Sequence, residues 1–124
     1  MSANLPPYAH LLGISVEADG TLAMPFGTAV LGRPGYLHGG AIAGLLEMAL
    51  HKALREELGA EAADTVIKPI NVTITYMRGG REMMTYAKAV VNRVGSRVAN
   101  VEAHAWQDDA NAPIASASCN FLKG

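Results

Sequence analysis

The chain has 124 residues, of which half are apolar and 17% are charged, and its ten Lys and Arg nearly balance eleven Asp and Glu. A chain of this length buries roughly two-thirds of its unfolded surface, so we expect a single domain, residues 1–124, with a genuine core. The balanced charge, without a run of one sign, argues against binding to nucleic acid or to an anionic membrane. Because charged residues are too few to cover a monomer, we expect a homo-oligomer, either a dimer or a dimer of dimers.

Targeting signals are not evident in the sequence. The N-terminus lacks the basic region, apolar core and cleavage site of a secretory signal. The longest apolar stretch, residues 39–50, is interrupted by Glu47 and falls well short of the roughly 20 residues that a bilayer span needs. Cys119 is the only cysteine, so an internal disulfide is excluded. The sequence therefore predicts a cytoplasmic protein.

Two small elements are predicted near the N-terminus. Two prolines followed by an apolar cluster predict a short helix within residues 4–12, which Gly13 would end. An Asp-Gly turn at residues 18–20 lies between alternating segments, which predicts a hairpin with short strands at residues 14–17 and 21–24.

The only long helix is predicted for residues 40–58. Residues 25–37 contain glycines and prolines without a sustained period, which indicates a long ordered loop before this helix. The first three helical turns are apolar nearly all round, so we expect them to be buried. The apolar positions at helical spacing are Ile42, Leu45, Leu46, Ala49, Ala53 and Leu54.

The remainder of the chain alternates with period two. In residues 70–76 the apolar side chains of Ile70, Val72, Ile74 and Tyr76 share one face, which predicts a long half-buried strand. Glycine-containing or Pro-containing turns then lead through three further strands, so we expect the C-terminal half to be an antiparallel meander. The turns are predicted at residues 78–80, 94–96 and 108–113, and the strands at residues 82–93, 97–107 and 114–122.

The last two predicted strands share a face of small apolar side chains. A sheet needs such side chains if it is to curve closely around a helix. We therefore predict an α+β fold in which one long central helix is wrapped by a curved antiparallel sheet of five to six strands. The residues of this face, with Cys119 interpreted as a core residue, are Ala99, Val101, Ala103, Ala105, Ala115, Ala117, Cys119 and Phe121.

Glu47 is the first candidate for chemistry. Its helical neighbours Ala43, Leu50 and Leu54 form an apolar stripe, so a carboxylate there must be paired, protonated or functional. A buried carboxylate is a poorly solvated base, which can activate water or attack an acyl carbon directly. The alternative interpretation is an exposed surface pair with His51.

The segment His38-Gly39-Gly40 stands directly before the long helix. Backbone N–H groups at a helix start lack intrahelical partners, and the helix dipole there favours negative charge. Glycine lets a ligand carbonyl approach the backbone closely, and one N–H group that stabilises an oxyanion contributes about 3 kcal/mol in other hydrolases. The alternative is that the glycines only permit a tight turn from loop to helix.

These two candidates belong to a longer motif. Residues 35–43 read GYLHGGAIA, and an acidic residue follows seven positions after the second glycine. This pattern resembles the signature of hotdog-fold acyl-CoA thioesterases of the phenylacetate-degradation type. The resemblance extends over nearly the whole chain, including the strand NVTITYMR, the Gly-Ser-Arg hairpin at residues 95–97 and the closing strand at residues 115–121. It implies a hotdog fold and hydrolysis of an acyl-CoA thioester to a free acid and coenzyme A.

The resemblance also implies the roles of individual residues. Glu47 takes the position of the catalytic carboxylate, as general base or nucleophile. The N–H of Gly39, together with Gly40, polarises the thioester carbonyl, and His38 belongs to the same catalytic motif. In the family the two groups come from different subunits, so we expect the site at a dimer interface. Coenzyme A enters as part of the substrate, and we expect no other cofactor and no metal site.

Arginines near strand ends are candidates for binding the phosphates of coenzyme A, because guanidinium groups bind phosphate through paired hydrogen bonds. The alternative for each is a solvated surface position. The predicted substrate and coenzyme A contacts are Arg33, Tyr36, Met77, Arg78, Gly95, Ser96 and Arg97.

Two positions depart from the family pattern. Gly32, six residues before the motif histidine, stands where the family usually has Asn or Gln to hold the water or the carbonyl. Pro69 stands where some relatives place a hydroxyl residue. These departures favour a second hypothesis, a non-catalytic acyl-CoA binding or sensing protein. A third, a dehydratase or hydratase, is disfavoured because the Asp or His pair of those relatives is not evident.

Overall fold

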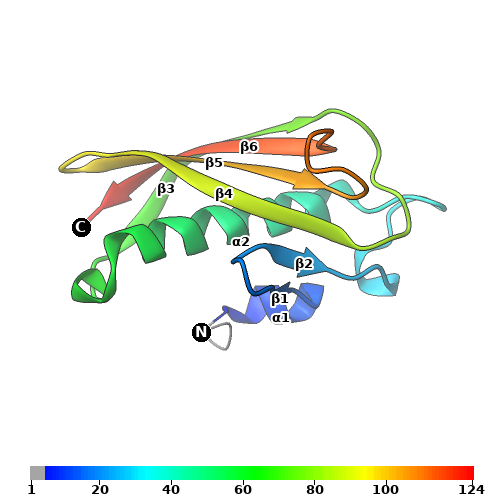
Figure 1. Cartoon of the computed structure of the whole chain (residues 1–124), viewed down its shortest axis with the longest axis horizontal. Helices are drawn as coiled ribbons and strands as arrows, with labels where there is room; N and C mark the ends of the chain where they lie inside the picture. The colour runs from blue at the N-terminus through cyan, green and yellow to red at the C-terminus, as the bar shows by residue number, and fades with distance from the viewer. Residues whose placement is uncertain (1–4) are drawn as a thin grey trace.

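A long helix lies across one face of a curved antiparallel sheet in the computed structural model, which describes residues 5–124 (Figure 1). The predicted N-terminal helix is α1 (Pro7–Leu12), with proline in its first turn as expected, and residue 4 of the predicted range lies outside the described residues. Gly13 ends α1 in the left-handed conformation, with φ of 75°, as predicted for a glycine at this position. The predicted hairpin is confirmed by β1 (Ser15–Val16) and β2 (Leu22–Met24).

The predicted long helix is α2 (Gly39–Leu58), which Gly59 ends. The preceding loop is ordered, as expected, and contains the short turn η2 (Thr28–Val30). A second short turn, η3 (Ala60–Ala62), follows α2. Most of the apolar helix positions are buried, which confirms the central place of α2. Its buried residues are Ala41, Ile42, Gly44, Leu45, Leu46, Ala49, Leu50 and Leu54.

The four long strands are β3 (Ile67–Tyr76), β4 (Thr85–Val94), β5 (Val98–Trp106) and β6 (Ala115–Lys123). The sheet has the order β1-β2-β4-β5-β6-β3, so β4, β5 and β6 form the predicted meander. The expectation that a turn at residues 78–80 joins β3 to β4 as neighbours is wrong. β3 pairs with β6 instead, and the N–H groups of Met77 and Arg78 continue beside β6 by donating to the carbonyl of Ile114. β3 is therefore an outer strand of the sheet.

The edge position of β3 also changes its predicted burial. Val72 and Ile74 pack against the core as expected, but Ile70 is 57% exposed and Tyr76 is 52% exposed. The register of β3 with β6 shifts between Pro69 and Asn71, which interrupts the alternation that placed Ile70 on the inner face. The predicted half-buried face is thus confirmed only in the middle of the strand.

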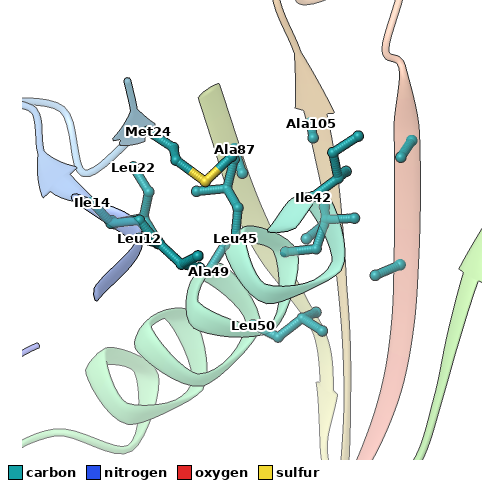
Figure 2. Packing of buried hydrophobic residues seen from close by; sticks show 14 of the residues in the cluster. Leu12, Ile14, Leu22, Met24, Ile42, Leu45, Ala49, Leu50, Ala87 and Ala105 are labelled. Carbon is teal, nitrogen blue, oxygen red and sulfur yellow. The ribbon is translucent and has the colours of Figure 1, made fainter. Parts of the chain in front are cut away.

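The core lies between α2 and the inner face of the sheet. Figure 2 shows Leu22 and Met24 of β2 pointing toward Leu45 of α2, with small alanine side chains on the neighbouring strands. The predicted small face of β5 and β6 is buried throughout, including Cys119. Small side chains let the sheet approach the helix closely, and this confirms the expected hotdog arrangement. Within residues 5–124, no helix is both long enough and apolar enough to cross a bilayer.

Candidate functional site

His38 caps the start of α2 through its side chain. The Nδ1 atom of its imidazole accepts a hydrogen bond from the N–H of Gly40 at 2.9 Å. Among residues 5–124, no acceptor is paired with the N–H of Gly39. Of the two donors predicted for the thioester carbonyl, Gly40 is therefore engaged within the chain and Gly39 is available.

Tyr76, at the end of β3, contacts the same helix start. Its hydroxyl donates a hydrogen bond to the carbonyl of Gly39 at 2.8 Å. Its ring would lie in ordinary van der Waals contact, about 3.7 Å, with a Cβ atom placed on Gly39. The alternation of β3 placed Tyr76 on an apolar face and assigned it no role, because the contact depends on how β3 packs against α2.

A cavity of about 480 Å³ opens beside this helix start. Its volume falls within the range of about 300–1,000 Å³ that is usual for small-molecule sites. Four of the predicted substrate contacts, Arg33, Tyr36, Met77 and Arg78, lie together here with Gly39. The described lining contains two arginines and no acidic residue. The full lining is Gly32, Arg33, Tyr36, Leu37, His38, Gly39, Ile42, Tyr76, Met77, Arg78, Gly79 and Gly80.

Two arginines lie beside the ring of Tyr36, which lines this cavity. The guanidinium carbon of Arg33 lies 4.6 Å from the centre of the Tyr36 ring, and that of Arg81 lies 5.9 Å from it. Arg78 lines the cavity itself. In the described part of the chain, ion pairs do not involve any of these arginines. Arg81 was not predicted from the sequence, although it follows Arg78 by only three residues across two glycines.

Glu47 does not reach this cavity in its own chain. It lies eight residues after Gly39 on α2, which corresponds to about 12 Å along the helix axis. Its side chain is half-buried, and among residues 5–124 it has neither a hydrogen-bond nor an ion-pair partner. The alternative of a surface ion pair with His51 is therefore not found.

Two titratable groups lie near Glu47. Burial and, to a lesser extent, the negative charge of Glu47 raise the pKa of the Cys119 thiol to about 11. Burial lowers the pKa of His51 below 6.5, and the charge of Glu47 only partly opposes this. Glu47 thus faces the region where α2 packs on β6. Within residues 5–124, His, Cys, Asp and Glu side chains do not gather in a group that could bind a metal ion.

A model of the thioesterase superfamily matches residues 34–114, a span that includes the helix start, Glu47 and all of the cavity lining except Gly32 and Arg33. The chain belongs to the thioesterase superfamily. No match was found among curated protein sequences.

Solved structures of other bacterial proteins share the fold. A Chromobacterium violaceum protein is 32% identical over 94% of this chain and 82% of its own, with a TM-score of 0.69. A Bacillus halodurans protein, solved with CoA, is 24% identical over 94% of this chain and 75% of its own, with a TM-score of 0.80. A phenylacetic acid degradation-related protein of Ralstonia eutropha is 21% identical over 94% of this chain and 89% of its own, with a TM-score of 0.71.

The predicted contacts Gly95, Ser96 and Arg97 lie far from the cavity in this chain. They form the turn between β4 and β5, where the N–H of Gly95 donates to the carbonyl of Val98. Strand pairing places this turn at the end of the sheet opposite Tyr76 (Figure 1). Their role in binding stays a prediction, and it requires a second subunit.

The two departures from the superfamily pattern have different surroundings. Gly32 lines the cavity and packs against the backbone of Leu37 and His38. Pro69 is exposed at the register shift of β3, where a residue without an N–H group is tolerated on an edge strand. Neither supplies a polar side chain that could hold a water molecule.

Proposed function

We propose that the protein hydrolyses acyl-CoA thioesters to a free acid and coenzyme A, in a site that joins Gly39 of one subunit to Glu47 of another. The observation that carries this proposal is the N–H of Gly39, which has no acceptor within residues 5–124, at a cavity whose arginines form no ion pair in the same residues. A donor at a helix N-terminus favours negative charge, and an oxyanion forms on the carbonyl oxygen when a thioester is attacked.

The arginines suit the coenzyme A part of the substrate. Arg33, Arg78 and Arg81 lack carboxylate partners in the described chain, so phosphate groups would meet unneutralised guanidinium groups. The Tyr36 ring beside them offers a flat surface for stacking. The Bacillus halodurans relative was solved with CoA, which supports this assignment.

The proposed reaction needs only water and groups of the protein. Glu47 removes a proton from water, the resulting hydroxide attacks the thioester carbon, and the N–H of Gly39 stabilises the oxyanion. Collapse of this intermediate breaks the carbon–sulfur bond, the thiolate of coenzyme A leaves and takes the proton from Glu47, and the acid is released. In the nucleophilic variant the carboxylate attacks the same carbon and water cleaves the resulting anhydride.

The distance between Gly39 and Glu47 supports a site shared by two subunits. Gly39 and Glu47 of one chain are separated by about 12 Å along α2, which exceeds the reach of two groups acting on one carbonyl. Large apolar side chains of β3 and the segment after it, Ile70, Tyr76 and Met77, are about half exposed in the single chain. Contact with another copy through this region would remove them from water.

Thiol release from a panel of aryl-, short-chain and medium-chain acyl-CoAs tests the proposal. Glu47→Gln should abolish release while leaving acyl-CoA binding, measured by calorimetry, nearly unchanged. Glu57→Gln is the matched control, because Glu57 lies on the same helix and is exposed. The proposal fails if native protein binds no acyl-CoA, or if Glu47→Gln retains native turnover.

The alternative function is acyl-CoA binding or sensing without hydrolysis. The observation that favours it is Gly32, which supplies no side chain to hold the attacking water. Binding of acyl-CoA by the native protein, without thiol release across the whole panel, would establish this alternative.

A further inference from the structure

We propose that Tyr76 is a positioning residue, which orients the Gly39 donor by holding the neighbouring peptide group. This inference rests on the proposed function, because it assigns how the thioester carbonyl is polarised. It concerns one peptide unit, the amide that joins Gly39 to Gly40.

Both ends of that peptide unit are hydrogen bonded to side chains. Its carbonyl, from Gly39, accepts from the Tyr76 hydroxyl at 2.8 Å. Its N–H, from Gly40, donates to Nδ1 of His38 at 2.9 Å. The two bonds run through one amide, so each strengthens the other by polarising it.

The preceding residue is held equally firmly by its backbone. The N–H of His38 donates to the carbonyl of Val30 at 2.8 Å, and its carbonyl accepts from Ala41 at 3.0 Å. The two peptide units that flank the Cα atom of Gly39 are therefore both fixed. These fixed peptide units set the direction in which the N–H of Gly39 points. Within residues 5–124 this N–H has no acceptor.

Glycine makes this support necessary. A residue without Cβ has wide conformational freedom, and a helix start frays more readily than its middle. A donor that is oriented before the substrate binds loses no free energy to reorganisation during the reaction. Without the Tyr76 hydroxyl, the carbonyl of Gly39 would be held by the first turn of α2 alone, and small shifts of that turn would move the donor with it.

Tyr76 is placed for this role rather than for core packing. Its side chain is 52% exposed and lines the cavity, so its hydroxyl contributes little to burial. The hydroxyl belongs to an edge strand that is 37 residues away from Gly39 in the sequence. The contact therefore ties the position of β3 to the geometry of the donor.

The test compares Tyr76→Phe with the native protein in thiol-release kinetics. The ring and its packing stay, and only the hydrogen bond is lost. We expect kcat to fall between about five- and fifty-fold, with KM within about twofold, because the donor is misaligned in the transition state and not removed. Tyr86→Phe is the matched control, because Tyr86 stacks on Trp106 and lies outside the cavity lining.

A purely structural role predicts a different result. If Tyr76 only supported the fold, Tyr76→Phe would lose stability together with turnover. If Tyr76 positions the donor, turnover falls while the unfolding transition matches the native one. Native kcat in Tyr76→Phe, while Glu47→Gln abolishes turnover, would overturn this inference and leave the proposed function standing.

If the native protein binds acyl-CoA without hydrolysing it, NMR of bound acyl-CoA labelled with ¹³C at the carbonyl is used to compare the native protein with Tyr76→Phe. Polarisation by Gly39 shifts the bound carbonyl resonance downfield, and Tyr76→Phe should reduce this shift. An equal shift in both proteins would overturn the inference. Absence of any binding would remove the proposed function and the inference together.

Discussion

Gly32 lies so close to His38 that a Cβ atom on Gly32 would be 3.0 Å from both the backbone N and the Cα of His38. Backbone hydrogen bonds hold both Gly32 and His38 in place. The N–H of Gly32 donates to the carbonyl of Tyr36, and the N–H of His38 donates to that of Val30. Such a contact is tighter than nearly all that real Cβ atoms make, so a side chain here, including the Asn or Gln of the superfamily pattern, would require the loop or His38 to shift.

We expect that Gly32→Asn, which restores the residue of the superfamily pattern, will not increase activity. The overpacked side chain should lower the free energy of unfolding by about 1–3 kcal/mol, and kcat should not rise, because His38 and the helix start are displaced. Urea unfolding and thiol release measure the two effects. Gly27→Ala is the control from the same loop, since Gly27 is extended and a Cβ there meets nothing within 4 Å. A stable and faster Gly32→Asn would contradict this account.

Gly39 allows its N–H group to be removed without disturbing the helix. Gly39 is the first residue of α2, a position that favours proline, and His38 already has the extended conformation that precedes proline. We expect Gly39→Pro to lower kcat by about 10²- to 10³-fold while the unfolding transition is retained. Gly39→Ala keeps the N–H and has room for its Cβ, so its kcat should stay within about tenfold of native. Equal losses in the two variants would exclude a donor role for the N–H.

Mixing two inactive variants tests whether the site spans two subunits. Chains carrying Glu47→Gln and chains carrying Gly39→Pro are co-expressed in equal amounts. Half of randomly paired dimers are mixed and each has one intact site of two, so we expect about one quarter of native activity. A site within one chain would give no activity above that of the parents.

The regular elements could be predicted because their signals are local. The period of α2 and the alternation of β4, β5 and β6 are carried by consecutive residues, and the structure confirms both. The partner of β3 could not be predicted, because alternation gives the exposed face of a strand and not its neighbour. The bulge at Pro69 likewise has no signal in the pattern of Ile70 and Val72.

In the candidate site too, local features could be predicted and tertiary contacts could not. The motif around Gly39 placed the donor and Glu47 on one helix. Arg33, Tyr36 and Arg78 line one cavity, and their contact with a substrate stays a prediction. The cap by His38 could have been recognised, since its side chain directly precedes the helix. The hydrogen bond from Tyr76 depends on tertiary packing over 37 residues, and the sequence carries no signal for it.

His51 should make the stability depend on pH. Its ring lies edge-on to Phe121, with ring centres 4.9 Å apart, and burial is the largest cause that lowers its pKa below the usual 6.5. Below pH 6.5 His51 therefore binds a proton more readily in the unfolded chain than in the folded protein, so the free energy of unfolding falls as the pH decreases.

Urea unfolding at pH 7.5 and 5.5, at one protein concentration, should show a smaller decrease in the free energy of unfolding for His51→Leu than for the native chain. His104→Leu, on the exposed face of β5, should retain the native decrease, and equal decreases in all three proteins would show that His51 is not the group responsible.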